Sequence, residues 1–262
     1  MGFFDSGVGG LSIWLETAKL MPNENSVYYA DSNNCPYGVK SDQDIQVIVK
    51  NITEFLINDQ NRCKIIVVAC NTASGIALNY LRSTFPNYLF VGIEPAIKLA
   101  AQATKSKVIG VLATAGTFRG TLFNQTYGKY CKDIEVIIED AKGLAQLVEE
   151  GKFQTDETRA VLKKYLDPMI TKKADQIVLG CTHYPFLIEI MQEILPKNVN
   201  IINPAPAVAK QIERVLVQNH LRNENSTTAN HQFFVNGNPS VLKSMMDKFY
   251  TTNNYKITQR SN

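Results

Sequence analysis

The 262-residue sequence predicts an α/β protein with two pseudosymmetric three-layer α/β domains, mainly parallel sheets and an active site in the interdomain cleft. Two observations support this fold class. Short runs rich in Val and Ile alternate with longer segments of helical period, which is typical of parallel sheets covered by helices on both faces. Three short patterns also recur, in the same order, about 110 residues further along the chain.

The alternation predicts the elements in chain order. The expected strands are Gly2–Phe4, Ser26–Ala30, Lys64–Ala69, Leu89–Gly92, Val108–Leu112, Ile134–Ile138, Gln176–Gly180, Asn200–Asn203 and Gln232–Val235. The expected helices are Leu11–Leu20, Gln43–Asn58, Ala73–Phe85, Pro95–Thr104, Gly116–Tyr130, Thr155–Ile170, Phe186–Ile194, Pro206–Asn219 and Ser240–Phe249. The polar segment Arg222–Asn230 is rich in Asn, Ser and Thr, and we expect a surface loop there.

The internal repeat indicates duplicated halves. Its matching pairs are Gly2–Gly7 with Gly110–Gly116 (offset 108), Val67–Thr72 with Val178–His183 (offset 111), and Ile93–Ala96 with Ile202–Ala205 (offset 109). The helix, strand and last helix after about Pro206 have no counterpart in the second half, so we expect them to return to the first. This predicts one domain from residues 1–97 plus 208–262 and a second from 98–207.

The corners that follow four of the expected strands are candidate site positions. Ligands of open α/β sheets bind beyond the carboxyl ends of the strands. In the duplicated arrangement the corners after Phe4, Ala69, Leu112 and Gly180 are expected to face one cleft between the domains.

Composition excludes several classes of protein. The 27 Lys and Arg residues and 24 Asp and Glu residues give a net charge of +3 and are scattered, so we expect no nucleic-acid partner. No apolar stretch reaches the roughly 18 residues of a membrane span, so we expect no membrane partner. The chain also opens without an apolar signal-peptide core, which predicts a cytoplasmic protein. The odd number of cysteines, five, fits free thiols in a reducing compartment.

Cys70 and Cys181 occupy equivalent places in the repeat, each at the end of an apolar strand and before a polar step into a helix. A thiol near a helix N-terminus is favoured as thiolate, and the free-cysteine pKa of about 8.5 lies close enough to neutrality for proton transfer. A single buried thiol more often acts as a small apolar side chain. The symmetric pair reverses that preference, whereas Cys63 and Cys131 lack such a setting and Cys35 is a candidate for lining the cleft.

Two thiols facing each other across a cleft suggest inversion at a carbon centre. One thiolate removes a proton from one face, and the other thiol delivers a proton to the opposite face, without a cofactor. The glycine-rich Gly7–Gly10 lacks the features of a phosphate-binding loop and is expected to allow close approach of the loop to the cleft. The three histidines are dispersed and no Cys-x-x-Cys occurs, so we expect neither a metal site nor a cofactor.

Four segments, Phe4–Leu11, Asp31 with Pro36–Gly38, Ala69–Ser74 and Gly180–Pro185, resemble the signature segments of the glutamate racemases, within the aspartate/glutamate racemase superfamily. The resemblance runs from residue 2 to about residue 249. It implies cofactor-independent inversion of the α-carbon of glutamate by two cysteines, with D-glutamate supplied to peptidoglycan synthesis. We also expect a homodimer.

The resemblance implies a role for each matching residue. Cys70 and Cys181 would be the acid/base pair, Asp5 and His183 would assist them, and Glu149 would be a further carboxylate. The implied substrate-binding residues are Asp5, Ser6, Tyr37, Gly38, Asn71, Thr72, Thr114, Thr117, Thr182 and His183.

Four of these residues also have simpler interpretations. Asp5 could cap the turn before the next helix, and Glu149 beside Glu150 could be a solvated charge. Tyr37 could pack at a turn, and His183 could be an ordinary hydrogen-bonding residue of the cleft wall.

The chain departs from the family pattern at several positions. Where this chain has Ala113, Gly120 and Phe123, the family commonly has Gly, Ser and Tyr, and it has a larger apolar residue in place of Cys35. The sequence therefore does not define which residues contact the carboxylates of the substrate. The first expected strand begins at Gly2, so we expect no long N-terminal extension of the kind found in precursor-activated members. Two alternatives remain: an aspartate racemase or related two-cysteine isomerase, and a binding protein that keeps the cleft without chemistry.

Overall fold

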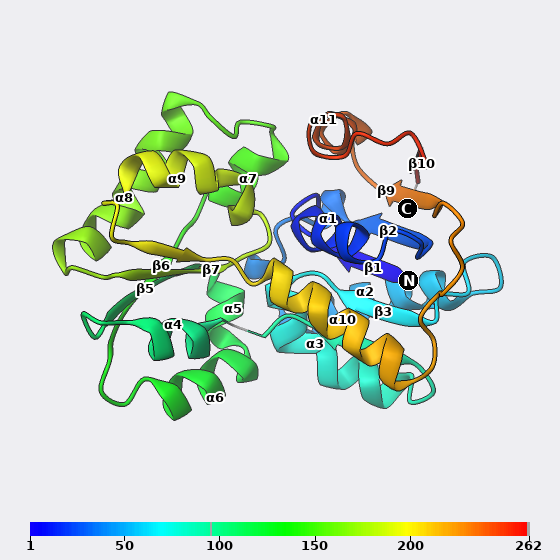
Figure 1. The fold of residues 1–262 in the computed structure, drawn as a ribbon, viewed down its shortest axis with the longest axis horizontal. Coiled ribbons are helices and arrows are strands. Elements are labelled where there is room, and N and C mark those ends of the chain that lie inside the picture. Colours follow the sequence, from blue (N-terminus) through cyan, green and yellow to red (C-terminus); the bar gives the residue numbers. More distant parts are fainter. Residues whose placement is uncertain (95, 261–262) are drawn as a thin grey trace.

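Two separate parallel β-sheets form the framework of the computed structural model, which describes residues 1–94 and 96–260 and, at Leu122, the backbone alone. In spatial order the larger sheet contains β10 (Tyr255–Gln259), β9 (His231–Val235), β2 (Ser26–Ala30), β1 (Gly2–Asp5), β3 (Ile65–Val68) and β4 (Leu89–Gly92). The smaller contains β6 (Glu135–Asp140), β5 (Val108–Ala113), β7 (Gln176–Gly180) and β8 (Asn200–Ile202). All of these neighbours pair in parallel. The predicted α/β fold class with two parallel-sheet domains is confirmed (Figure 1).

Helices cover both faces of each sheet. Around the larger sheet lie α1 (Leu11–Leu20), α2 (Asp42–Ile57), α3 (Asn71–Thr84), α10 (Ala205–Gln218) and α11 (Pro239–Phe249). Around the smaller lie α4 (Ile97–Ala103), α5 (Ala115–Arg119), α6 (Thr121–Tyr130), α7 (Leu144–Glu149), α8 (Asp156–Thr171) and α9 (Ile188–Ile194). Short 3-10 helices occupy Ser32–Asn34, Tyr37–Val39 and Tyr184–Leu187.

The strand side chains alternate between the two faces, as the pleat requires. In the larger sheet Phe3 belongs to the apolar cluster that includes α1, α10 and α11, and Phe4 to the cluster that includes α2 and α3. In the smaller sheet Leu112 packs in the cluster of α7, α8 and α9, and Val111 in the cluster of α4 and α6. The first cluster is continuous between the two halves, so the halves share part of one core.

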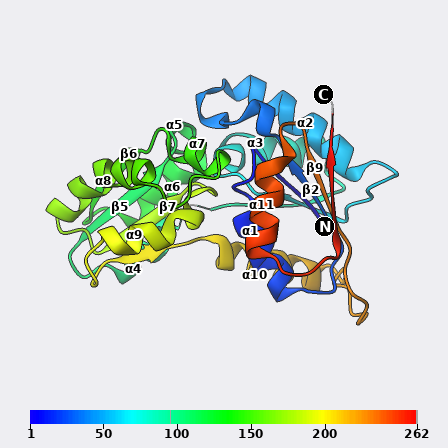
Figure 2. The ribbon, with the colours of Figure 1, turned by 90° about the horizontal axis from the view of Figure 1, so that it is seen from above.

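The C-terminal elements join the first half. Strand β9 pairs with β2, and β10 pairs with the outer side of β9. Helix α10 packs against α1. Figure 2 shows α11 and β9 within the half that also holds the N-terminus. The domain division at residues 1–97 plus 208–262 and 98–207 stays a prediction, and its boundaries fall near the starts of α4 and α10.

The structure differs from the expected elements in four places. The single helix expected over Gly116–Tyr130 is divided into α5 and α6 at Gly120, whose backbone is extended (φ −64°, ψ 139°). A Cβ at Gly120 would lie 3.0 Å from the Cα of Gly75, so α3 packs too closely there for a larger residue. The helix expected from Pro95 begins at Ile97, and Pro95 lies outside the described residues. Helix α7 and strand β10 were not expected.

In the part of the chain that the structure describes, every helix is too short or too polar to cross a membrane.

Candidate active site

A small cavity lies between the two halves of the molecule. Its lining residues, apart from Ala145 in α7, follow β1, β2, β3, β5 and β7, at the edge where parallel strands present their carboxyl ends. Its volume is about 20 Å³, enough for roughly one water molecule. It is lined by Ser6, Pro36, Tyr37, Gly38, Cys70, Asn71, Thr72, Thr114, Thr117, Ala145, Cys181, Thr182 and His183.

All of the site residues expected from the sequence line this cavity except Asp5 and Glu149, which lie directly behind it. Asp5 accepts a hydrogen bond from Thr182, and Glu149 is bonded to His183. Sequence reasoning gave no role to Pro36 and Ala145. Pro36 lies in the signature segment Pro36–Gly38, which could have indicated its place. Ala145 has no functional group, so nothing in the sequence marks it as a lining residue.

A second cavity, of about 370 Å³, lies between α3, β4, α4 and α10. It is larger but contains neither Cys70 nor Cys181. The small cavity is therefore the one in which the two symmetry-related thiols meet.

Local structure places Cys70 at a helix start. Strand β3 ends at Val68, and the amide of Ala69 still donates to the carbonyl of Phe4 in β1 at 2.8 Å. Cys70 is then the N-cap residue of α3. The same positive helix end faces the cavity, where it favours negative charge.

Asp5 is the polar partner of Cys70. The carboxylate of Asp5, fully buried at the end of β1, accepts a hydrogen bond from the Gly10 amide at 2.7 Å, and its charge acts on the Cys70 thiol. Burial raises the pKa of Asp5. Burial, and after it the charge of Asp5, raise the pKa of the Cys70 thiol well above its usual range. The raised pKa favours the protonated form of the Cys70 thiol.

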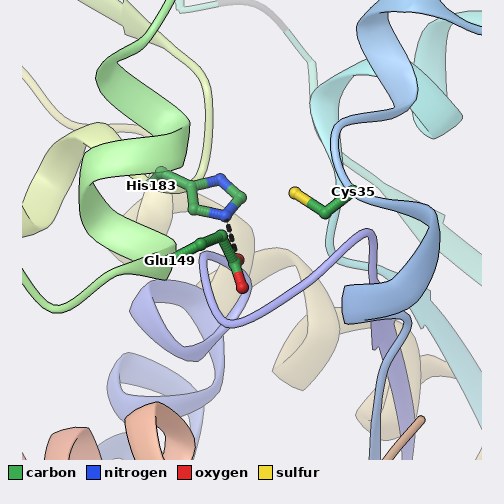
Figure 3. Close-up of side chains that lie close together, drawn as sticks. All are labelled: Cys35, Glu149 and His183. Atoms are coloured by element: carbon green, nitrogen blue, oxygen red, sulfur yellow. Dashed lines mark hydrogen bonds and ion pairs between the residues drawn. The ribbon is translucent and has the colours of Figure 1, made fainter. Parts of the chain in front are cut away.

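His183 is the corresponding partner of Cys181. Its Nδ1 lies 3.5 Å from the Cys181 sulfur, and its Nε2 lies 2.6 Å from Oε1 of Glu149 (Figure 3). Burial alone would lower the pKa of His183, but its hydrogen-bond partners, Cys181 first among them, raise it well above its usual range. An imidazolium beside a thiol is a partner that stabilises a thiolate.

The glycine loop approaches this pair closely, as the sequence predicted. A Cβ at Gly9 would lie 2.4 Å from the ring of His183, and one at Gly7 would lie 2.0 Å from the Glu149 carboxylate. The amide of Val8 donates to Oε1 of Glu149 at 2.7 Å. The α7 carboxylate thus links the second half to the loop after β1 in the first half.

Hydroxyl groups from both halves meet on another wall of the cavity. The Thr72 and Thr114 hydroxyl oxygens are 2.9 Å apart, and Thr114 and Thr117 are 3.2 Å apart. The buried amide oxygen of Asn71 has no hydrogen-bond partner within the described chain. Such an orphaned acceptor in a cavity wall is suited to a donor group of a ligand.

Tyr37 contributes its ring and backbone rather than a free hydroxyl. Its hydroxyl donates to Oδ2 of Asp31 at 2.5 Å. Asp31, a signature residue to which the sequence assigns no role, therefore fixes the segment that carries Tyr37 and Gly38.

Comparisons with known proteins place the chain in a family. Residues 15–212 match the family described as Asp/Glu/Hydantoin racemase. The glutamate racemase of Herpetosiphon aurantiacus is 40% identical over 92% of this chain and 93% of its own length. The chain belongs to this family. It is an amino-acid racemase, and hence an isomerase.

Solved structures of the family have the same fold. A glutamate racemase isoform from Bacillus anthracis matches with a TM-score of 0.85 and 30% identity, covering 100% of this chain and 96% of that one. The Escherichia coli glutamate racemase, solved with L-glutamate and the activator UDP-MurNAc-Ala, matches with a TM-score of 0.86 and 28% identity, covering 99% and 97%. The resemblance expected from the signature segments is confirmed.

Proposed function

We propose that this racemase interconverts L- and D-glutamate without a cofactor, with Cys70 and Cys181 as the acid/base pair. One observation carries the proposal: the two thiols, which follow equivalent strands of the two halves, line the same cavity of about 20 Å³. Relatives that share 40% of their residues with this chain are glutamate racemases, and one related structure holds L-glutamate.

The chemistry consists of two proton transfers on opposite faces of the α-carbon. With one enantiomer bound, the Cys181 thiolate takes the α-proton and the Cys70 thiol gives its proton to the other face. The product then leaves Cys181 as thiol and Cys70 as thiolate, which is the protonation state that the reverse reaction needs. His183 supports charge at Cys181, and the charge of Asp5 favours the protonated form of the Cys70 thiol. General acid–base catalysis by such positioned groups contributes roughly 10²- to 10⁴-fold.

The polar lining would hold the charged ends of the substrate. The orphaned amide oxygen of Asn71 is an acceptor for the α-ammonium group. Hydroxyls of Ser6, Thr114 and Thr182 and the backbone amides near Gly38 are donors for the two carboxylates. Preorganised donors also stabilise the negative charge that develops when the α-proton leaves.

Substrate binding requires the cavity to widen, because its volume accommodates about one water molecule and no amino acid. Several hydrogen bonds cross between the halves around the cavity, among them the one between Thr72 and Thr114, the one from Val8 to Glu149 and the one from Thr182 to Asp5. We infer that these bonds break or lengthen as the halves separate. Closure around the substrate would then exclude water from the reacting carbon.

The resemblance also supports a cellular setting. We propose that the D-glutamate formed supplies peptidoglycan synthesis, that the protein is a cytoplasmic homodimer, and that its partner is the small-molecule substrate rather than nucleic acid or membrane. Assays on both amino acids separate this function from that of an aspartate racemase, and proton exchange separates it from that of a binding protein.

The test is racemisation in deuterium oxide. The purified chain, dialysed against a chelator and without added cofactor, is incubated with L-glutamate while circular dichroism follows the loss of chirality. We expect the signal to decay to zero and the D-glutamate formed to carry deuterium at the α-carbon. Retained chirality with no deuterium incorporation would leave only a binding protein.

A further inference from the structure

Three side chains with different ligand atoms gather beside the cavity: His183, which lines it, and Cys35 and Glu149, which do not. Cys35 has no part in the mechanism. The sulfur of Cys35, a carboxylate oxygen of Glu149 and a ring nitrogen of His183 all lie within 4.8 Å of one another. Figure 3 shows the Cys35 sulfur directed at the imidazole, with Glu149 bonded to the same ring. This is the one such group of possible metal ligands found among the described residues.

The three ligands come from both halves of the molecule. Cys35 lies between the 3-10 helices Ser32–Asn34 and Tyr37–Val39, Glu149 ends α7, and His183 follows β7. Sequence spacing gave no sign of the group, because Cys35 and Glu149 are 114 residues apart and no Cys-x-x-Cys or His pair is involved. Only the apposition of the halves creates it.

Thiolate sulfur, imidazole nitrogen and carboxylate oxygen are the protein ligands of Zn²⁺. Atoms within 4.8 Å of one another leave a central point no more than roughly 2.8 Å from each of them. Zinc bonds of roughly 2.0–2.3 Å therefore require small shifts in two senses: the Cys35 sulfur moves inward, whereas Nε2 of His183 and Oε1 of Glu149, which are 2.6 Å apart, separate to admit the ion. Rotation about side-chain bonds supplies movements of this size without a change of backbone.

Neighbouring groups hold two of the ligands in place. Val8 donates its amide to Oε1 of Glu149 at 2.7 Å, and the Ser32 hydroxyl lies 3.4 Å from Oε2. The Cys181 sulfur, 3.5 Å from Nδ1, fixes the plane of the His183 ring. Such outer contacts orient ligands and raise metal affinity.

We propose that Cys35, Glu149 and His183 form an inhibitory site for one thiophilic divalent cation of the Zn²⁺ class, with a fourth position left for water. The bound cation replaces the thiol proton of Cys35 and the proton shared by His183 and Glu149, and both protons pass to the solvent. It takes His183 and Glu149 out of the proton-transfer machinery and ties Cys35 in the first half to the second half. The cavity is then held shut against substrate.

Binding is tested with Zn²⁺ alone on the full, chelator-treated chain, by isothermal titration calorimetry and by Co²⁺ substitution. Cys35→Ser removes the sulfur at nearly constant size. Cys63→Ser is the control, because that thiol lies outside the group and bonds to the carbonyl of Asn61. We expect one cation per chain for wild type and Cys63→Ser, with a thiolate-to-cobalt absorption band. Cys35→Ser should bind at least about tenfold more weakly and lack the band, since loss of even an outer contact costs about 10- to 100-fold.

Three results would overturn the site. The first is no saturable Zn²⁺ binding by wild type, and the second is wild-type affinity in both Cys35→Ser and Cys35→Ala. The third is loss of binding in Cys181→Ser with full binding in Cys35→Ser, since the reaction thiols would then be the ligands.

The inhibition rests on the proposed function, whereas the binding measurement does not, so the two can fail separately. Each variant is compared with its own metal-free rate of racemisation. We expect Zn²⁺ to inhibit wild type and Cys63→Ser at concentrations that fill the site, Cys35→Ser to need at least about tenfold more, and a chelator to restore the rate. If wild type racemises glutamate at its full rate when the site is saturated with Zn²⁺, the site is not inhibitory.

Discussion

The hydroxyl of Tyr37 donates a 2.5 Å hydrogen bond to Oδ2 of Asp31, and this contact holds the segment that carries Tyr37 and Gly38. The same carboxylate accepts from the side-chain amide of Asn34 at 2.9 Å and from that of Asn236, which follows β9. The C-terminal part of the chain thus helps to position one wall of the cavity.

Tyr37→Phe should therefore act on stability rather than on substrate binding. Loss of one bond to a buried carboxylate lowers the free energy of unfolding by about 1.5–3 kcal/mol. The KM for glutamate should change by less than about threefold, because the hydroxyl is already engaged. Urea unfolding and steady-state kinetics test this, with Tyr165→Phe, whose hydroxyl donates to the Lys142 carbonyl, as the control. A large rise in KM without loss of stability would mean that the hydroxyl binds substrate.

The features that sequence reasoning found are local or repeated. The nine expected strands and the two thiols follow from alternating apolar runs and from a repeat, both of which are visible in one dimension. The sequence does not predict helix α7, because its six residues are too few to show a helical period. The sequence does not predict strand β10 either, because this strand lies at the edge of its sheet. Its side chains, which include Lys256 and Thr258, are exposed or only partly buried, so they form no apolar run.

The contacts that sequence reasoning missed depend on the apposition of distant segments. Asp31 with Asn236, and Cys35 with His183, are separated by more than one hundred residues. Neither pair has a periodic or motif signal of its own. Their geometry exists only when the C-terminal strands join the first sheet and the two halves face each other.

His231 gives the stability of the first half a pH dependence. Its Nδ1 shares a hydrogen bond of 2.8 Å with the Ser26 hydroxyl, whose oxygen accepts from Nε1 of Trp14. The ring packs edge-on against Trp14 at 5.0 Å. Burial lowers the pKa of His231 to about 4, so the folded state keeps the ring neutral where the unfolded chain takes up a proton.

Because the pKa of His231 is lower in the folded state than in the unfolded chain, the free energy of unfolding falls as the pH falls. Above the unfolded pKa of about 6.5 the ring is neutral in both states and contributes no pH dependence. As the pH falls from about 6.5 to about 4, stability is lost, by about 2–3 kcal/mol in all. Urea unfolding across this range should show a shallower loss in His231→Asn than in wild type, whereas His220→Asn, at an exposed position, should follow wild type. Parallel curves for wild type and His231→Asn would contradict the assignment.

Neither Cys70 nor Cys181 should be dispensable. Alanine at either position should lower racemisation in both directions by about 10²- to 10⁴-fold, with an unchanged far-ultraviolet spectrum. In deuterium oxide each variant should still exchange the α-proton of one enantiomer, and a different one in each case, because a single thiol serves a single face. Cys131→Ala, a buried thiol outside the cavity, is the control. Near-wild-type turnover in either variant would rule out the two-base mechanism.

Glutamate should be preferred to aspartate by at least about tenfold in kcat/KM. The side-chain carboxylate needs donors distinct from those of the α-carboxylate, and the shorter aspartate falls one methylene short of them. Losing one charge-assisted hydrogen bond costs about 1.5–3 kcal/mol. Thr114→Val, which removes a hydroxyl 2.9 Å from that of Thr72, should narrow the preference. Equal kcat/KM for the two amino acids would reduce the protein to a broader amino-acid racemase.

Asp5 and His183 should affect the two directions of the reaction differently. The charge of Asp5 adds to burial in raising the pKa of the Cys70 thiol, and Nδ1 of His183 lies 3.5 Å from the Cys181 sulfur, so each residue acts on a different thiol. Because the equilibrium constant of a racemisation is one, kcat/KM must remain equal in the two directions in every variant. The asymmetry must therefore fall on kcat and KM separately.

We expect Asp5→Asn and His183→Asn to shift the ratio of the two kcat values in opposite senses. Each variant weakens the support of one thiol, so the direction in which that thiol acts as base is affected differently from the direction in which it acts as acid. Initial rates from L- and from D-glutamate, followed by circular dichroism to saturation, give both ratios. A kcat ratio unchanged from wild type in both variants would mean that Asp5 and His183 hold the substrate and do not tune their neighbouring thiols.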